Sequence, residues 1–283
     1  RVRVVAPSSP FDRTLVLRGM GFLAEHFHVE FDPGLFQRQG YLSGSDDRRL
    51  EELNRALEST EVRAVVAARG GYGLSRIVDR VDWRAFQKNP KWIVGFSDIT
   101  VLHAKAWELG VASLHAHNVA GLGRGDAKGR SSWVESLRAP EAPRSLQGKS
   151  AWVGGSARGI LVGGNLTMLF TSAAAGKLWL PPGCVLALED VGESSYRIDR
   201  MLTALLSGGK LAEVAALALG EFVDCSSGTY SVSVDAVLEE RLSGLGIPTL
   251  AGLPFGHGRF NQPLPLGTLT ELDADRKVLL LGR

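Results

Sequence analysis

Residues 92–109 read WIVGFSDITVLHAKAWEL. The apolar run Trp92–Phe96 predicts a buried strand, and the stretch Ile99–Leu109 predicts a helix. Ser97 lies between them, where the chain must turn sharply from one element into the other. A strand followed at once by a helix is the building block of a parallel sheet, so this stretch indicates an α/β fold.

The same alternation of short apolar runs and amphipathic stretches extends over residues 1–120. Further strands are predicted at Val2–Val5, Val29–Phe31, Val62–Ala67 and Val111–Leu114. Further helices are predicted at Asp12–His26, Asp46–Leu57 and Leu74–Arg80. Strands separated by helices form βαβ units, and we therefore expect a mostly parallel sheet in this part of the chain.

Residues 121–150 differ in character, since they are rich in Gly, Arg, Ser and Pro and show little periodicity. They predict a linker with one short helix around Trp133–Leu137, between a first domain (1–120) and a second α/β domain (151–283). Strands of the second domain are predicted at Trp152–Val153, Arg158–Val162, Val185–Leu188, Ala215–Phe222 and Lys277–Leu281. Its helices are predicted at Asn165–Ala174, Ser195–Leu206 and Ser233–Leu242.

The chain has 283 residues, of which 45% are hydrophobic and 22% charged, an ordinary globular composition. Its 32 basic and 30 acidic residues nearly cancel, which gives no support to a nucleic-acid or membrane-surface partner. The opening RVRVVAPSSP predicts a strand that ends at Pro7 rather than a secretory signal. No run approaches the ~20 apolar residues of a membrane span, and we expect a cytoplasmic protein.

Cysteine and histidine give no metal-binding pattern. Cys184 and Cys225 border apolar runs, and two cysteines do not make a disulfide framework, so we interpret both as buried apolar residues. His115 and His117 stand two residues apart after a predicted strand, but no third ligand accompanies them. We therefore expect no metal.

Ser97 has two interpretations. A serine at a tight strand-to-helix turn is typical of a nucleophile elbow, in which the helix N-terminus stabilises a developing oxyanion. The elbow pattern is G-x-S-x-G, and here Gly95 opens it while Ile99 stands in the last position. The same serine could simply cap the following helix. The local pattern leaves both interpretations open.

Three other loops follow predicted strands, where ligand sites of parallel sheets gather. The first is Arg69-Gly70-Gly71-Tyr72-Gly73 (the glycine loop), which could be a plain turn or a phosphate cradle. In the second, Glu189 and Asp190 end a strand, where a carboxylate could orient a histidine. In the third, His257 stands between two glycines, which makes it a candidate general base.

Taken together, the sequence resembles the family of serine peptidases typified by muramoyl-tetrapeptide L,D-carboxypeptidase, which includes microcin C immunity peptidases. The matching stretches are VVAPSSP (4–10), ARGGYG (68–73), IVGFSDIT (93–100), GGNLTML (163–169), LALEDVGESSYRIDR (186–200) and PFGHG (254–258). They run in order along nearly the whole chain. Two segments depart from the family pattern: a His-Gly-Pro-like run is replaced by His115-Ala116-His117, and Gly125–Lys149 has no match.

The resemblance implies a flavodoxin-like N-terminal domain with a mostly parallel sheet and a smaller C-terminal α/β domain. It implies a Ser–Glu–His triad, with Ser97 as the nucleophile, Glu189 as the acid and His257 as the base. Ser97 then belongs to the first domain, and Glu189 and His257 belong to the second.

The implied mechanism needs an oxyanion hole and substrate contacts. The backbone N–H of Asp98 and one from Gly70 or Gly71 are expected to bind the oxyanion. Arg69, Tyr72 and Asn165 are expected to contact the substrate. Arg69 or Arg197 could bind its free carboxylate, although a structural role is the commoner one for either arginine.

The implied function is release of terminal D-alanine from murein tetrapeptides during peptidoglycan recycling, with no metal or organic cofactor. Within the family, the alternative is hydrolysis of microcin C-type peptide–nucleotide antibiotics, for which Trp133 and Trp152 could line a pocket. An alternative of another class is a non-catalytic protein that binds nucleotide or phosphate through the glycine loop. A homodimer is implied by the resemblance alone.

Overall fold

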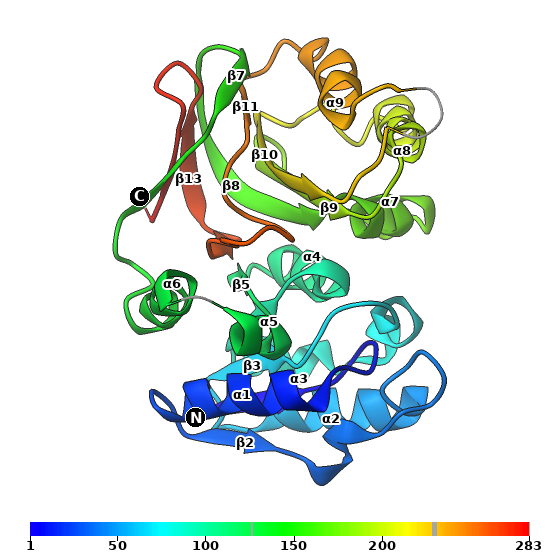
Figure 1. The fold of residues 1–283 in the computed structure, drawn as a ribbon, viewed down its shortest axis with the longest axis vertical. Coiled ribbons are helices and arrows are strands. Elements are labelled where there is room, and N and C mark those ends of the chain that lie inside the picture. Colours follow the sequence, from blue (N-terminus) through cyan, green and yellow to red (C-terminus); the bar gives the residue numbers. More distant parts are fainter. Residues whose placement is uncertain (126, 228–230, 283) are drawn as a thin grey trace. The chain divides into compact units, whose positions relative to one another are not determined.

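The computed structural model describes residues 1–125, 127–227 and 231–282 (Figure 1). The chain forms two compact units, Arg1–Arg138 (unit 1) and Ala139–Arg283 (unit 2), of which unit 2 is slightly the longer. Each unit combines helices with a sheet, which confirms the predicted α/β class. The domain bounds expected from the sequence stay a prediction. The expected linker, 121–150, contains helix α6 (Ala127–Arg138) and strand β6 (Arg144–Gln147).

Unit 1 contains a sheet whose strands follow the order β2-β1-β3-β4-β5, all parallel. The strands are β1 (Val2–Val5), β2 (Val29–Phe31), β3 (Ala64–Ala67), β4 (Trp92–Gly95) and β5 (Ser113–His115). This is the strand order of flavodoxin-like folds, which confirms the fold expected for the N-terminal part. In such folds ligands bind beyond the carboxyl ends of the strands, beside the switch in order between β1 and β3.

Helices pack against this sheet. They are α1 (Arg13–Ala24), α2 (Asp46–Glu58), α3 (Trp83–Lys88), α4 (Thr100–Glu108), α5 (Val119–Arg124) and α6. Helices α1 and α5 lie side by side (Figure 1). Their approach requires glycine, because a Cβ at Gly19 would come within 2.1 Å of the Val119 carbonyl oxygen and one at Gly123 within 1.9 Å of the Leu15 oxygen. Apolar side chains from the strands and α6, among them Val66 and Trp133, are fully buried in the core.

One predicted helix of unit 1 is wrong. Leu74–Arg80 forms two short 3₁₀ turns, η2 (Leu74–Arg76) and η3 (Val78–Arg80). Ile77 separates them, because its φ of −120° does not fit a continuous helix. Helices α3 and α5 were not predicted, since with six residues each is too short to display a helical repeat.

Unit 2 contains a sheet in the order β6-β14-β13-β8-β9-β10-β11-β7. Strands β8 to β11 along it are parallel, and the pairs at both ends are antiparallel. The remaining strands of the unit are β7 (Ser150–Val153), β8 (Ser156–Asn165), β9 (Val185–Val191), β10 (Ala216–Val223), β11 (Thr249–Ala251), β12 (Leu264–Leu266), β13 (Leu269–Asp273) and β14 (Val278–Leu281). Strands β11 to β13 were not predicted, because runs of three to five residues show little periodicity.

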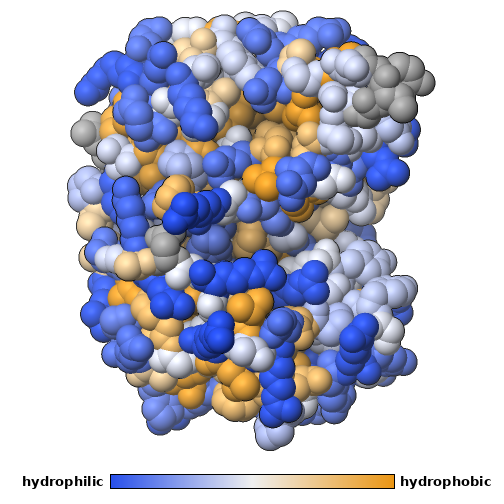
Figure 2. Space-filling view, viewed as in Figure 1, coloured by the Kyte–Doolittle hydropathy of each residue, from blue (hydrophilic) through white to orange (hydrophobic). Residues whose placement is uncertain are grey.

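The helices of unit 2 are α7 (Leu166–Ala174), α8 (Ser195–Ser207) and α9 (Val234–Ser243). All three lie within about a residue of their predicted bounds, and in Figure 1 they lie on one side of the sheet. Hydrophilic and hydrophobic residues are mixed on the face of the molecule drawn in Figure 2. Across the described residues, no helix combines the length and the apolar character needed to cross a membrane.

Candidate active site

Ser97 has an unusual backbone conformation. Strand β4 ends at Gly95, and Ser97 follows with a φ of +67°, a left-handed value that few residues other than glycine adopt. The residue opens the short turn η4 (Ser97–Ile99), which leads into α4. The N-cap positions of η4 and α4 are Phe96 and Ile99, and neither has a side-chain capping bond. The N-cap interpretation of Ser97 is therefore wrong, and the turn has the strained strand-to-helix geometry of an elbow.

Two buried side chains hold this turn in place. Asn118 accepts a hydrogen bond from the Phe96 N–H at 3.2 Å. His103 lies on α4, with Nε2 2.9 Å from the Gly95 carbonyl oxygen and Nδ1 2.9 Å from the Ser113 hydroxyl. Because a carbonyl oxygen only accepts, Nε2 is the donor and Nδ1 the acceptor. Complete burial lowers the pKa of His103 to about 3, so the ring is neutral at physiological pH.

The glycine loop lies directly against Ser97. A Cβ at Gly70 would come within 2.8 Å of the Ser97 Cβ and 3.1 Å of its Oγ, so only glycine fits there. The Ser9 N–H donates to the Gly70 carbonyl at 3.2 Å, and the Ser9 hydroxyl accepts from the Tyr72 N–H at 3.0 Å. Gly71, with a φ of +101°, passes so close to Ser9 that a Cβ would clash with its side chain. The structure thus brings Gly70 and Gly71 together with Ser97, through contacts within unit 1.

Arg69 lines an open cavity of about 410 Å³ in unit 1. Its Nη1 donates to the Pro10 carbonyl at 2.6 Å. Arg13 and Arg38 line the same cavity, and among its described lining residues Asp12, which caps α1, is the only acidic one. Tyr72 is 45% exposed at the edge of the glycine loop, and its ring centroid lies 6.0 Å from that of Tyr41. Because three arginines and one aspartate line it, the cavity is basic and suits an anionic group.

Glu189 and His257 form a hydrogen-bonded pair in unit 2. The Nδ1 of His257 lies 2.7 Å from Glu189 Oε2, and because the carboxylate accepts, Nδ1 carries the proton. Glu189 is fully buried on β9, and the His257 side chain is 15% exposed. The loop can approach only because Gly256 has no side chain, since a Cβ there would lie 2.9 Å from the Glu189 Cβ. The Gly256 N–H also donates to Asn261 at 2.9 Å, which fixes the loop.

Asp190, the neighbouring carboxylate, is directed to a different partner. Its Oδ1 accepts from Asn165 Nδ2 at 2.8 Å, and its Oδ2 accepts from the Thr167 hydroxyl at 2.8 Å. Burial raises the pKa of Asp190, and the hydrogen bonds from Thr167 oppose that rise. Asn165 in turn caps α7 by accepting from the Met168 N–H at 3.2 Å. The described contacts of Asp190 and Asn165 thus anchor the start of α7.

The other predicted polar residues have simple surroundings. Arg197 is exposed and lies 3.5 Å from the Glu193 carboxylate. Cys184 is buried, which raises the pKa of its thiol to about 11, and Cys225 is half-buried. In the part of the chain that the structure describes, no three His, Cys, Asp or Glu side chains are grouped as metal ligands.

Sequence reasoning missed three polar residues around the elbow. Ser8, Asn118 and the side chain of Asp98 are all buried and hydrogen-bonded beside Ser97 or the glycine loop. Ser8 and Asp98 stand inside the stretches VVAPSSP and IVGFSDIT, so their signal was present as motif identity. Their contacts join positions far apart in the sequence, and local patterns do not carry that information.

Comparison with known proteins places the chain in a family. Residues 2–116 match the LD-carboxypeptidase N-terminal domain, and residues 158–272 match the LD-carboxypeptidase C-terminal domain. The chain therefore belongs to the LD-carboxypeptidase family, a family of peptidases, as the sequence motifs predicted.

The relatives cover almost the entire chain. A putative carboxypeptidase of Synechocystis sp. is 39% identical over 96% of this chain and 95% of its own length. The murein tetrapeptide carboxypeptidase of Pseudomonas aeruginosa is 32% identical over 98% and 94%. The crystal structure of muramoyltetrapeptide carboxypeptidase from Oxalobacter formigenes is 29% identical, covers 99% of this chain and 97% of its own, and superimposes with a TM-score of 0.88. The microcin C7 self-immunity protein of Escherichia coli is 25% identical over 96% and 89%.

Proposed function

We propose that the protein is a serine-type L,D-carboxypeptidase that releases the terminal D-alanine of murein tetrapeptides. The observation that carries the proposal is the hydrogen bond between Glu189 and His257. Among the described serines, Ser97 alone combines a positive φ with a strand-to-helix elbow. Relatives named as murein tetrapeptide carboxypeptidases, which match along almost the whole chain, support the choice of substrate.

In the proposed reaction, Ser97 Oγ attacks the scissile carbonyl and passes its proton to His257. Since Nδ1 of His257 is bonded to Glu189, the proton goes to Nε2, which later returns it to the leaving amine. Glu189 holds the imidazole in this tautomer and stabilises the imidazolium that forms. Water then hydrolyses the acyl-enzyme and frees Ser97.

The oxyanion is proposed to bind the backbone N–H of Asp98 and one N–H of the glycine loop. The support is that Gly70 lies against Ser97 and that a helix follows the elbow directly. A donor of this kind contributes about 3 kcal/mol of transition-state stabilisation.

Arg69 is the residue we propose for the free carboxylate of the substrate. It lines the basic cavity together with Arg13 and Arg38, and it directly precedes Gly70, which contacts Ser97. Tyr72, exposed on the same loop, is proposed as a second contact. Asn165 is proposed as a further contact, and its side chain also bonds Asp190 and caps α7. A homodimer is proposed on the family resemblance alone, and a cytoplasmic location is proposed on the sequence pattern alone.

The alternative substrate is a peptide–nucleotide of the microcin C type, supported by the match to the microcin C7 self-immunity protein. Trp133 does not favour it, because this side chain is fully buried and its Nε1 donates to the His117 carbonyl at 3.0 Å. Membership in a family of peptidases argues against the other alternative, a non-catalytic protein that binds nucleotide or phosphate through the glycine loop.

The test is D-alanine release from purified murein tetrapeptide by the wild type and by Ser97→Ala, with the peptide–nucleotide assayed in parallel. Ser207→Ala, an exposed serine at the end of α8, is the matched control. We expect release by the wild type and the control, none by Ser97→Ala, and a loss of about 10⁴-fold in kcat for Glu189→Gln. Release that survives Ser97→Ala would exclude this nucleophile. Turnover of the peptide–nucleotide alone would select the alternative substrate.

A further inference from the structure

Asp98 connects three loops of unit 1 through one buried carboxylate. The residue follows Ser97 directly, and its side chain is completely buried. Its Oδ2 accepts from the Ser8 hydroxyl at 2.7 Å and from the Leu74 N–H at 3.0 Å. Ser8 stands in the loop after β1, and Leu74 directly follows the glycine loop, where η2 begins. One oxygen thus ties both neighbouring loops to the elbow that follows β4.

Arg49 also ties the same two loops together. This fully buried arginine reaches from α2, and its Nη1 donates to the Pro7 carbonyl and, at 2.9 Å, to the Gly73 carbonyl. Gly73 has a φ of +141°, and a Cβ there would lie 2.7 Å from Arg49 Nη1, so the contact depends on glycine. Pro7 and Gly73 directly precede Ser8 and Leu74, so each loop is held at two successive residues.

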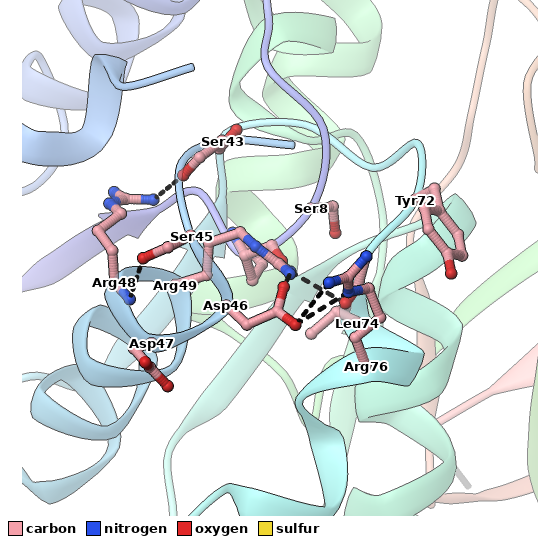
Figure 3. Close-up of polar contacts among 12 residues, drawn as sticks. Ser8, Ser43, Ser45, Asp46, Asp47, Arg48, Arg49, Tyr72, Leu74 and Arg76 are labelled. Carbon is pink, nitrogen blue, oxygen red and sulfur yellow. Dashed lines mark hydrogen bonds and ion pairs between the residues drawn. The ribbon is translucent and has the colours of Figure 1, made fainter. Parts of the chain in front are cut away.

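A surface ion-pair network fixes the guanidinium of Arg49. Figure 3 shows Asp46 between Arg49 and Arg76, with Ser8, Leu74 and Tyr72 grouped beside them. Arg49 Nη2 donates to Asp46 Oδ1, and Arg76 Nε donates to Asp46 Oδ2 at 2.9 Å. The side-chain hydrogen bonds from Arg76 and Arg49 lower the pKa of Asp46 despite a desolvation that acts to raise it. The network therefore stays charged at neutral pH.

The charge of Asp98 depends on this surrounding. Burial raises the pKa of the Asp98 carboxyl to about 6, while the Ser8 hydroxyl, the Leu74 N–H and the charge of Arg49 act to lower it. At neutral pH the carboxylate is therefore ionised. Hydrogen bonds to an ionised acceptor are about twice as strong as bonds between neutral groups. Here they offset the free energy lost when the Asp98 carboxylate is withdrawn from water.

We propose that Asp98 and Arg49 are positioning residues that hold the glycine loop against Ser97, so that its backbone N–H groups face the developing oxyanion. The inference rests on the proposed function and goes beyond it, since neither side chain takes part in the triad. Gly70 and Ser97 lie in contact. The loop between Gly70 and Gly73 accepts hydrogen bonds from the Ser9 N–H at Gly70 and from Arg49 at Gly73, and Leu74, which follows it, donates to Asp98. A donor that stabilises only the transition state acts on kcat.

The test compares Asp98→Ala, Asp98→Asn and Ser8→Ala with the wild type, and Asp47→Ala serves as a surface control on α2. For Asp98→Ala we expect kcat for tetrapeptide hydrolysis to fall about 10- to 100-fold, with KM changed less than about 3-fold. Asp98→Asn keeps an acceptor oxygen but loses the charge, so it is expected to recover only part of kcat. Ser8→Ala removes one of the two bonds and is expected to lower kcat about 3- to 10-fold. Asp47→Ala is expected to match the wild type.

A second readout separates positioning from general destabilisation. The rate of Ser97 labelling by a fluorophosphonate, which also forms an oxyanion, should fall in parallel with kcat. Tetrapeptide affinity, measured in a Ser97→Ala background with and without Asp98→Ala, should stay constant. If folded Asp98→Ala keeps wild-type kcat and labelling rate, the inference is wrong.

Should Asp98→Ala fail to fold, Ser8→Ala decides, and an unchanged kcat in that variant would overturn the inference. Failure of this inference can be told apart from failure of the proposed function, because in the first case the wild type still releases D-alanine. A wild type that neither releases D-alanine nor is labelled at Ser97 would overturn both.

Discussion

At the scale of the residue, Ser97 is held in a conformation that its side chain disfavours. A non-glycine residue with a left-handed backbone loses about 1–2 kcal/mol, and the surroundings must compensate for it. Here the Phe96 N–H is bonded to Asn118 and the Gly95 carbonyl is bonded to His103, so both residues preceding Ser97 are fixed. Strain of this kind is typical of functional positions, where geometry is preserved at the expense of stability.

Comparing two inactive variants measures this strain. Ser97→Gly relieves the left-handed conformation, and Ser97→Ala retains it. We expect Ser97→Gly to have the higher free energy of unfolding, by about 1 kcal/mol, although glycine also gains entropy in the unfolded chain. Urea denaturation of both proteins provides the measurement. Equal stabilities would mean that the positive φ of Ser97 carries no strain.

At the scale of the element, the parallel strands bring loops from distant parts of the sequence to the same edge. Strands β4, β3 and β1 are neighbours in the sheet, so the elbow, the glycine loop and the loop after β1 meet at their carboxyl ends. Glycine sets how closely these loops approach, because Gly70 lies against Ser97 and Gly71 against Ser9. The loops therefore tolerate no side chain at the contact points.

Gly70→Ala tests this contact. The added Cβ would lie 2.8 Å from the Ser97 Cβ and 3.0 Å from the Phe96 carbonyl oxygen, so either the elbow or the loop must move. We expect kcat/KM to fall about 100-fold or more while the protein still folds. The matched control is Gly21→Ala on α1, where no atom lies within 4 Å, and it should raise the free energy of unfolding by about 0.5–1 kcal/mol. A Gly70→Ala enzyme with wild-type kcat/KM would contradict the close contact.

At the scale of the whole molecule, buried titratable groups couple folding to pH. Burial lowers the pKa of His103 from 6.5 to about 3. Between these values the unfolded chain binds more protons than the folded one, so the contribution of His103 to stability is lost as pH falls. Burial raises the pKa of Glu52 from 4.5 to about 7 and that of Asp98 from 3.8 to about 6. These two groups act in the opposite direction, because the folded state binds the extra protons.

The variant His103→Gln isolates the contribution of His103 to the pH dependence of stability from those of Glu52 and Asp98. We expect the difference in free energy of unfolding between the wild type and His103→Gln to widen as pH rises to 6.5, and to level off above it. Urea denaturation at several pH values gives this difference. A constant difference for His103→Gln would mean that this ring titrates normally in the folded state.

The sequence alone determined the α/β class, most of the strands and helices, and the family, because each of these follows from local periodicity or from short motifs. Family motifs singled out Glu189 and His257, and in the structure the two side chains are hydrogen-bonded. Only the tertiary structure decided that Leu74–Arg80 is not a helix and that Ser97 does not cap one. It alone joined Asp98 to Ser8 and Leu74, and Arg49 to Gly73. The physical reason is that backbone strain and hydrogen bonds between distant residues arise only when the sheet assembles. They produce no repeating pattern of residues that could be recognised in the sequence.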